Sequence, residues 1–339
     1  MNAPLLELVD LTVNYPLRGS GFPGRSGRQV VHAVEGVSLT LDPGQIVALV
    51  GESGCGKSTV ARAIVGLQPA TSGQVIFDGT DLTGLRAGAL RPYRRAIQLV
   101  HQDPYDALDP RMTVRAIVEE GLRIHRVPRG DRDAIVRGAL ERVGLTPADW
   151  VLGRFPHELS GGQRQRVAIA SAIALTPRLL VADEPVSMLD VSVRASVLGL
   201  IEDLRRDGLA VLLITHDLAG AVMLADRIAV MYFGRIVEEG PVGEVMDFPA
   251  HPYTRALLSA IPSPDPAVRT VPDVVAGELP DAVHPPPGCA FASRCPVAEP
   301  RCGEHVPPLI EVGSGHRAAC ILAARGLIPN APAPRPPSF

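Results

Sequence analysis

The sequence has no apolar run long enough to cross a bilayer. Its longest apolar stretches, such as Val167–Leu175, fall short of the roughly 18–20 residues that a spanning helix requires and instead suit buried helices. The N-terminus also lacks the basic start and long apolar stretch of a signal peptide. We therefore expect a soluble, cytosolic chain that reaches a membrane only through a partner.

A strong excess of charge of one sign is also absent. The formal net charge of −3 gives no electrostatic case for a nucleic-acid partner. Five cysteines in a chain expected in the cytosol argue against a disulfide framework. The 339 residues, of which 46% are hydrophobic and 20% charged, form an ordinary globular composition that suits about two domains.

Apolar strand patterns alternate with helical patterns along most of the chain. Strands are predicted at residues 6–13, 30–41, 46–50, 75–78, 97–100, 179–182, 211–215 and 228–231. Helices are predicted from within 56–58 to about Leu67, at 161–175 and at 192–206. This alternation predicts an α/β fold with a largely parallel sheet and a ligand at the carboxyl ends of its strands.

A helical insertion is expected between the two halves of this α/β core. Apolar residues recur there at helical spacing, at Val114, Ile117, Val118 and Leu122 and again at Ile135, Ala139, Leu140 and Val143. Two other stretches have little pattern. Leu17–Arg28 is rich in Gly, Arg and Pro and is expected to be flexible, and from Phe248 onward the chain is Pro-rich. We interpret 248–325 as an irregular accessory region and 326–339 as a disordered tail.

Gly51–Ser58 matches the phosphate-binding pattern G-x-x-x-x-G-K-[ST] at every fixed position and lies between a predicted strand and a predicted helix. Its glycines let backbone N–H groups surround phosphate oxygens, Lys57 would neutralise the β/γ oxygens, and Ser58 would bind Mg²⁺. Cys55 needs no special chemistry there. The predicted ATP-binding residues of this loop are Gly51, Ser53, Gly54, Cys55, Gly56, Lys57, Ser58 and Thr59.

Polar residues follow three of the other predicted strands. Asp183 suits a Mg²⁺ role, and the adjacent Glu184 suits polarisation of an attacking water. His216 would contact the γ-phosphate, and Gln102 would touch both Mg²⁺ and water. Each is a weak signal alone, but the upstream phosphate-binding loop strengthens all of them.

A second phosphate-binding surface is predicted at Leu159–Gln163, which reads Leu-Ser-Gly-Gly-Gln. Its Gly-rich backbone and the Ser160 hydroxyl are groups suited to a phosphate. One chain therefore carries two different phosphate-binding surfaces. This indicates an ATPase whose site is completed by a second copy or a partner.

With these motifs in order, residues 5–245 resemble the ATP-binding subunits of ABC transporters. The resemblance implies a P-loop (RecA-like) nucleotide-binding domain at 1–247, with an antiparallel β subdomain and an α-helical subdomain at about 103–165. It implies that Tyr15 stacks on adenine, that Gln102 senses nucleotide and that Glu184 is the catalytic base. His216 would be the switch histidine, and 187–190, including Asp190, would be the dimer-crossing loop. The motif Ser160, Gly161, Gly162 and Gln163 would bind the ATP of the opposite subunit.

Two positions depart from the family pattern. Met188 stands where the family more often has alanine, and Ser171 stands where it usually has arginine. Neither change removes a catalytic group, but both lie where the subunit interface is expected. The choice between a homodimer and a heterodimer therefore stays open.

A narrower resemblance links 102–111 and the His-Pro-Tyr-Thr-Arg-Ala-Leu-Leu stretch at 251–258 to dipeptide/oligopeptide importer ATPases. It implies a subunit on the cytoplasmic face of the membrane that pairs with a second ATPase and two permease subunits. A solute-binding protein would act indirectly. Nickel importers share these features and stay the nearest alternative. A soluble ABC protein acting on ribosomes or DNA, and a non-catalytic cassette, are further alternatives.

Four cysteines gather in the accessory region, at Cys289, Cys295, Cys302 and Cys320. Paired C-x₂-C zinc knuckles are absent. Four thiolates from an irregular loop suit a [4Fe–4S] cluster or a structural Zn²⁺. The resemblance to peptide importers favours the cluster, in a structural role, over zinc or spare thiols.

Overall fold

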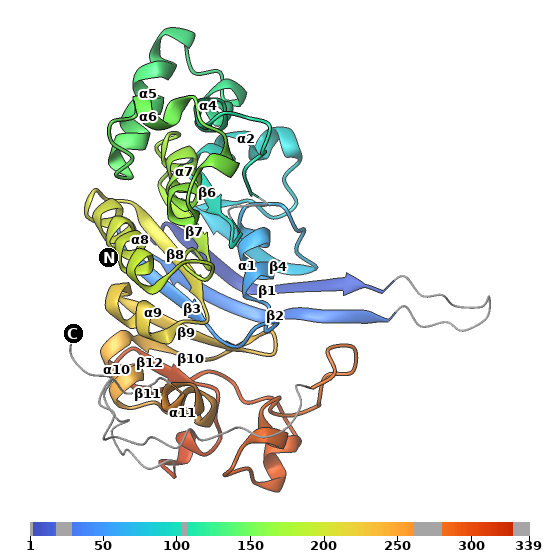
Figure 1. The fold of residues 1–339 in the computed structure, drawn as a ribbon. Helices are drawn as coiled ribbons and strands as arrows, with labels where there is room; N and C mark the ends of the chain where they lie inside the picture. The colour runs from blue at the N-terminus through green and yellow to red at the C-terminus, as the bar shows by residue number, and fades with distance from the viewer. Residues whose placement is uncertain (1–2, 18–28, 104–106, 261–279, 328–339) are drawn as a thin grey trace, which may run out of the picture. The chain divides into compact units, whose positions relative to one another are not determined.

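The computed structural model describes residues 3–17, 29–103, 107–260 and 280–327 (Figure 1). The chain forms two compact units. The first contains 1–40, 47–84 and 216–339, and the second contains 41–46 and 85–215. The expected flexible stretch at 18–28, part of the 102–111 motif and the tail from 328 lie outside the described residues.

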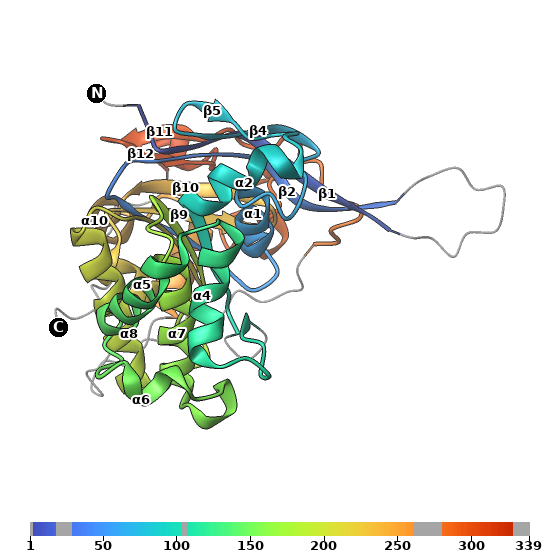
Figure 2. The ribbon, with the colours of Figure 1, turned by 90° about the horizontal axis from the view of Figure 1, so that it is seen from above.

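An antiparallel sheet in the first unit has the strand order β2-β1-β4-β5 (Figure 2). Its strands are β1 (Leu6–Pro16), β2 (Val30–Leu41), β4 (Ser72–Phe77) and β5 (Thr80–Asp81). Alternate residues of β1 are buried until a bulge between Val9 and Thr12 shifts the register against β4. This period of two is the pattern of a sheet with one buried face, as expected for an antiparallel β subdomain.

The first unit also contains a mixed sheet. β3 (Ile46–Val50) runs parallel to β9 (Arg227–Tyr232), which pairs antiparallel with β10 (Arg235–Pro241). β10 then pairs with β12 (His316–Ala318), and β12 pairs with β11 (Ile310–Gly313). Two strands from the C-terminal region therefore extend this sheet, and β9, β10 and β12 run side by side in Figure 1.

A buried carboxylate fixes the C-terminal region to β10. Glu238 is completely buried and accepts hydrogen bonds from the backbone N–H groups of Ala250 and His251, at 2.6 and 2.9 Å. The His316 Nε2 atom, on β12, lies 2.7 Å from the same carboxylate. Because a buried charge is costly unless its oxygens are bonded, these three contacts hold two separate C-terminal segments against one strand.

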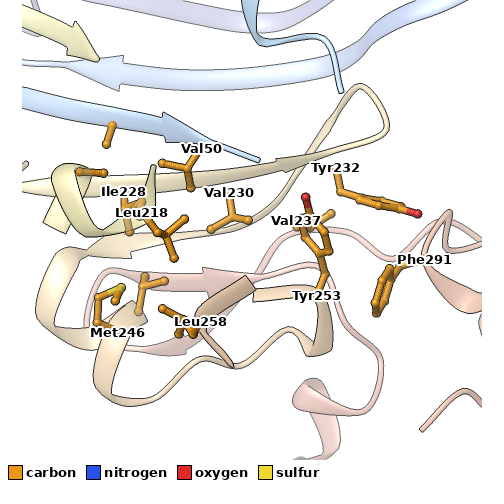
Figure 3. Close-up of a cluster of buried hydrophobic side chains, with 13 residues drawn as sticks. Val50, Leu218, Ile228, Val230, Tyr232, Val237, Met246, Tyr253, Leu258 and Phe291 are labelled. Atoms are coloured by element: carbon orange, nitrogen blue, oxygen red, sulfur yellow. The ribbon is translucent and has the colours of Figure 1, made fainter. Parts of the chain in front are cut away.

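Helices and aromatic rings complete the core of the first unit. Its helices are α1 (Lys57–Ile64), α9 (Leu218–Leu224), α10 (Val242–Asp247) and α11 (Pro252–Ser259). Val50 and Val230 from the strands pack with Tyr232, Tyr253 and Phe291 in one buried cluster (Figure 3). Phe291 lies in the accessory region, so that region contributes to this core rather than only covering it.

The second unit is built on three parallel strands, β6 (Ile97–Val100), β7 (Leu179–Asp183) and β8 (Ala210–Thr215). Every residue of β7 and β8 is buried, as expected of parallel strands covered on both faces. The helices α2 (Ala87–Ala96), α7 (Gly161–Ile173) and α8 (Val191–Arg206) belong to the same unit.

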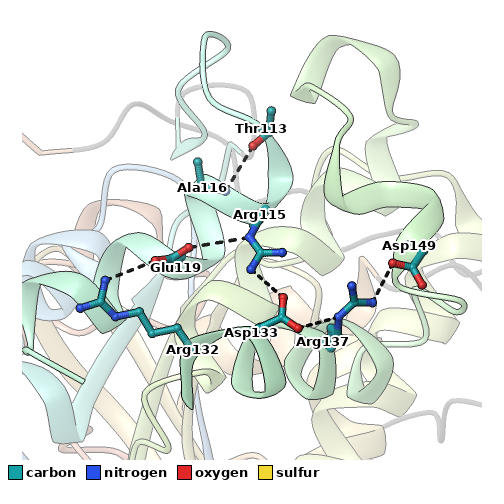
Figure 4. Close-up of polar contacts among 8 residues, drawn as sticks. All are labelled: Thr113, Arg115, Ala116, Glu119, Arg132, Asp133, Arg137 and Asp149. Carbon is teal, nitrogen blue, oxygen red and sulfur yellow. Dashed lines mark hydrogen bonds and ion pairs between the residues drawn. The ribbon is translucent and has the colours of Figure 1, made fainter. Parts of the chain in front are cut away.

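A helical part of the second unit contains α4 (Val114–Ile124), α5 (Arg129–Arg142) and α6 (Asp149–Leu152), and α4 and α5 pack on α7. Figure 4 shows ion pairs linking these helices: Arg115 and Arg137 both contact Asp133, at 2.6 and 3.0 Å, and Arg137 also contacts Asp149 at 2.7 Å. These side chains are partly exposed, so each pair adds little stability. Burial of its apolar face stabilises α4 more, because the four predicted apolar residues of this helix are all buried.

The predicted elements agree with the structure apart from their ends and the C-terminal region. The strands at 30–41, 46–50 and 97–100 have the predicted bounds. The helix after the phosphate-binding loop ends at Ile64 rather than near Leu67, and on α5 Val136 is buried where Ile135 is only partly so. The accessory region is less irregular than expected, because it contains α11, the β11–β12 hairpin and short 3₁₀ turns at 292–294, 300–303 and 323–325.

Candidate functional site

The phosphate-binding loop leaves β3 and enters α1 through backbone conformations that only glycine accepts. Gly51 has φ +156°, and a Cβ there would lie 2.1 Å from the carbonyl oxygen of Met231 on β9. Gly56 has φ +107°, and a Cβ there would lie 2.2 Å from the carbonyl oxygen of Ala33 on β2. The backbone of β9 and β2 therefore lies too close to the loop for a side chain at Gly51 or Gly56. This explains why the motif has glycine at both positions.

Lys57 lies inside the curve of the loop. Its side chain is buried, and its Nζ donates to the carbonyl oxygens of Gly51 and Glu52, both at 2.9 Å. The Cys55 Sγ atom lies 3.8 Å from the same amine. Burial raises the pKa of the Cys55 thiol, and the Lys57 charge only partly opposes this. Cys55 is therefore a neutral thiol beside the Lys57 amine.

Tyr15 and the first turn of α1 lie together beside this loop. The Tyr15 hydroxyl donates to the Thr59 Oγ1 at 3.5 Å. Ser58 and Thr59 are partly buried, whereas Ser53 and Gly54 are exposed. The N-terminus of α1 directs its backbone N–H groups and partial positive charge toward the loop, which favours an anion.

The loop residue Glu52 makes contacts that the sequence motifs do not predict. The Tyr253 hydroxyl on α11 accepts a hydrogen bond from the Glu52 backbone N–H at 2.8 Å. Glu52 occupies a variable position of the loop motif, so the motif gave no reason to consider it. The only signal in the sequence was the His-Pro-Tyr stretch that contains Tyr253.

In the second unit, the structure brings together Gln102 and Glu184, which are 82 residues apart. The Gln102 Nε2 atom donates to the Glu184 Oε2 at 2.8 Å. Asp183 is buried at the end of β7, and Glu184 follows it with φ +48°, in the left-handed region. A carboxylate and an amide held side by side can orient a water molecule and accept its proton.

The Leu-Ser-Gly-Gly-Gln motif forms the start of α7. The Ser160 Oγ accepts from the Gln163 N–H at 3.3 Å, and the Gln163 side chain accepts from the Ser160 N–H at 3.0 Å. This capping box leaves Ser160 exposed at the positive end of a helix. A Cβ at Gly162 would lie 2.5 Å from Val193 Cγ1, so α8 approaches the motif closely. Asp190, the residue before α8, is exposed.

The remaining predicted positions are all described. His216 is exposed directly after β8. Met188 is also exposed, with 59% of its surface accessible. The Ser171 hydroxyl donates to the Ile117 carbonyl on α4 at 3.5 Å, so it ties α7 to the helical part of its own unit. The expected roles of these three residues stay predictions.

The four C-terminal cysteines lie close to one another. Burial, with smaller contributions from the other three cysteines, raises the pKa of the Cys289 thiol to about 11. Burial also raises the pKa values of Cys295 and Cys320. The Cys289 N–H donates to the Cys302 carbonyl at 2.7 Å, which joins two of the segments. In the part of the chain that the structure describes, however, no three His, Cys, Asp or Glu side chains are arranged to hold a metal ion.

A membrane-spanning helix was not expected. In the described ranges, every helix is too short or too polar to cross a bilayer.

Comparison with known protein families gives two matches. Residues 34–187 match the family described as ABC transporter, and residues 237–302 match the family described as oligopeptide/dipeptide transporter, C-terminal region. The second match begins inside β10 rather than at Phe248. The strand shared between the cassette and the C-terminal region gives a structural reason for that earlier start.

Relatives match nearly the whole chain. A protein of Sinorhizobium fredii named probable peptide ABC transporter ATP-binding protein y4tS is 46% identical over 96% of this chain and 91% of its own length. The oligopeptide transport ATP-binding protein OppF of Salmonella typhimurium is 44% identical, over 94% and 96%.

Among solved structures, a post-hydrolysis dimer of the ATP-binding cassette MJ0796 bound to ADP and phosphate aligns with a TM-score of 0.61 and 30% identity. The alignment covers 70% of this chain and 98% of that one. The predicted α/β cassette fold is thereby confirmed.

Proposed function

Because this chain belongs to the ATP-binding subunits of ABC transporters, in the dipeptide/oligopeptide importer branch, and is an ABC-type ATPase, we propose that it powers the import of di- or oligopeptides across the cytoplasmic membrane. The observation that carries this proposal is that one chain matches both the cassette and the oligopeptide-type C-terminal region. Relatives named for peptide transport match it over nearly its full length.

This proposal assigns a role to each predicted site residue. Tyr15 stacks on adenine, and the loop 51–59 holds the phosphates, with Lys57 neutralising the β/γ oxygens. Ser58, Gln102 and Asp183 serve Mg²⁺. Glu184 accepts the proton of the attacking water, Gln102 orients that water, and His216 senses the γ-phosphate. The 2.8 Å contact between Gln102 and Glu184 supports the paired role of these two residues.

A second ATPase subunit completes each site in this proposal. The motif Ser160–Gln163, together with Asp190, acts on an ATP held by the partner's phosphate-binding loop. Support comes from the exposed, capped N-terminus of α7, where backbone N–H groups suit a phosphate. The dimer of the related cassette with ADP and phosphate supports assembly in pairs. We favour a heterodimer because the chain resembles the peptide-importer ATPases that pair with a second, similar ATPase. The departures at Met188 and Ser171 leave the choice open.

The other partners are two permease subunits, with a solute-binding protein acting through them. The protein would sit as a peripheral subunit on the cytoplasmic face of the membrane, where ATP binding closes the ATPase dimer and hydrolysis reopens it. The nickel importers of the same family are the second candidate, because they share the C-terminal motif. Nothing in the described residues favours nucleic acid as a partner.

The test is transport by the assembled complex in vesicles, with labelled di- and oligopeptides and with Ni²⁺ as the competing substrate. We expect ATP-dependent peptide uptake that stops when Lys57 is replaced by Ala. Uptake of Ni²⁺ without peptide would instead establish the nickel alternative. Co-purification with nucleic acid in place of membrane subunits would establish the soluble alternative.

For the four cysteines, we propose a shared structural site, a [4Fe–4S] cluster with Zn²⁺ as the alternative. The 2.7 Å backbone contact between Cys289 and Cys302, and the packing of Cys289 and Cys295 against one buried cluster, support this. The arrangement does not fit a single metal ion as it stands. A tetrahedral zinc site, with Zn–S bonds of about 2.3 Å, would draw the sulfurs to within about 4 Å of one another. The test is iron, sulfide and zinc analysis after anaerobic purification, and a metal-free protein with an intact fold would exclude both ligands.

A further inference from the structure

Two side chains from the C-terminal region meet at one residue of the phosphate-binding loop. The Tyr253 hydroxyl accepts from the Glu52 N–H at 2.8 Å. Arg294 binds the Glu52 carboxylate with both terminal nitrogens, Nη1 to Oε2 at 3.0 Å and Nη2 to Oε1 at 3.2 Å. Both the backbone and the side chain of Glu52 are therefore held from outside the cassette motifs.

These contacts rest on a rigid support. Tyr253 is completely buried, and only 9% of the Arg294 side chain is exposed. Arg294 also donates to the Tyr232 hydroxyl at 3.2 Å and lies over that ring. The rings of Tyr232, Tyr253 and Phe291 contact one another with centroids 4.6–5.4 Å apart (Figure 3). A bidentate ion pair that packs against three contacting aromatic rings has little freedom to move.

Holding Glu52 in place also holds Lys57, the residue proposed to bind the phosphates. The Glu52 carbonyl accepts from Lys57 Nζ at 2.9 Å, on the opposite end of the residue from the N–H that Tyr253 holds. The orientation of Glu52 thus sets where the Lys57 amine lies. A loop that is already ordered loses less conformational entropy when it binds its ligand.

We propose that Tyr253 and Arg294 are positioning residues for the phosphate-binding loop, through which the cysteine-bearing segment of the C-terminal region sets the affinity for ATP. Arg294 ends the 3₁₀ turn Ala292–Arg294 and directly precedes Cys295. Any change at the cysteines that moves this turn therefore also moves Arg294 and alters its contact with Glu52. The proposal rests on the ATP-binding part of the proposed function and needs neither peptide as substrate nor a particular metal.

The test compares Tyr253→Phe, Arg294→Gln, Glu52→Gln and the double variant of Arg294 and Glu52 in the full chain. Tyr253→Phe keeps the ring packing and removes only the acceptor for the Glu52 N–H. We expect the Kd for MgATP to rise about threefold to tenfold in Tyr253→Phe and about tenfold in each single charge variant. The double variant should be no weaker than either single one, because both remove the same contact.

The matched control is Arg301→Gln. Arg301 lies in the same region and pairs with Glu299, away from the loop, so its loss should leave the Kd unchanged. In the assembled complex, KM for ATP should rise while kcat stays within about twofold. A purely structural role would instead lower the melting temperature without moving the Kd. Wild-type ATP affinity in both Tyr253→Phe and Arg294→Gln would overturn the proposal.

The link to the cysteines has its own measurement. Cys295→Ser should change the Kd for MgATP in the wild-type background and have no effect when Arg294 is already Gln. No change in either background, or the same change in both, would overturn the link. Wild-type protein that binds ATP but transports no peptide would refute the proposed function while leaving these results interpretable.

Discussion

The Gln102 side-chain amide donates to the Glu184 carboxylate at 2.8 Å, and the two residues come from the ends of neighbouring parallel strands, β6 and β7. The amide holds the carboxylate in a fixed orientation at the end of β7. Glu184 itself has φ +48°, a strained conformation for a residue with a side chain, of the kind that often occurs at active sites.

The first prediction concerns this carboxylate. Glu184→Gln keeps the size of the side chain but removes the proton acceptor, so ATP turnover should fall at least about a hundredfold. MgATP binding should persist, and the dimer should accumulate in a closed, ATP-bound state. Steady-state ATPase assays and size-exclusion chromatography with ATP check both parts. Unchanged turnover would discard Glu184 as the base.

A second prediction separates a cap from a phosphate contact. Ser160 caps α7 and Thr113 caps α4 in the same unit, each hydroxyl accepting a backbone N–H at 3.3 Å. Ser160→Ala and Thr113→Ala should each lower the free energy of unfolding by about 1 kcal/mol. Only Ser160→Ala should reduce the ATPase rate of the assembled complex. Equal ATPase rates in the two variants would show that Ser160 is only a helix cap.

A third prediction tests the close approach at the loop. Gly56→Ala places a methyl group 2.2 Å from the Ala33 carbonyl oxygen, which must move, and it also strains a φ of +107°. The matched control is Gly79→Ala, which has φ +75° but no atom near its Cβ. Gly79→Ala should cost about 1–2 kcal/mol of stability and leave the Kd for ATP unchanged. Gly56→Ala should cost more and weaken ATP binding at least tenfold, as thermal melts and ATP titrations will show.

A fourth prediction concerns pH. Burial lowers the pKa of His251 to about 4, although Glu238 opposes the shift. The unfolded chain, with an ordinary pKa near 6.5, binds a proton earlier as pH falls. The contribution of His251 is therefore complete above about pH 6.5 and is lost progressively down to about pH 4. Lowering the pH from 7 to 5 should therefore reduce the free energy of unfolding by about 2 kcal/mol through His251.

The check on this pH dependence is His251→Asn. Asn also accepts the Tyr253 N–H as a helix cap, as His251 Nδ1 does at 3.0 Å, but it does not titrate. Urea denaturation at pH 7 and pH 5 should therefore give a smaller difference in the variant than in the wild type. Equal differences would show that other groups, such as the neighbouring carboxylates, cause the loss.

Most of the cassette could be predicted from sequence because its motifs are local. The loop from Gly51 to Ser58 lies between a buried strand and a helix, and all fixed positions of its motif fall within these eight residues. The strand at 46–50 is a continuous apolar run with little ambiguity. Motif order also sufficed to place Gln102 and Glu184 in one site, although only the structure shows their direct contact.

The contacts of the C-terminal region could not be predicted in the same way. Glu52 and Arg294 are 242 residues apart, and neither carries a pattern that points to the other. The strand β12 is only three residues long, too short for periodicity to show. It exists because β10 offers an edge to pair with, and such tertiary causes leave no local trace.

The buried carboxylate of Glu238 makes the cassette dependent on the C-terminal region for its solubility. A fragment that ends near residue 247 would keep this charge and the edge of β10 but lose all three of its recorded partners, Ala250, His251 and His316. An unpaired edge is a template for aggregation, and an unmatched buried acid opposes folding. The nucleotide-binding cassette should therefore be insoluble when produced alone.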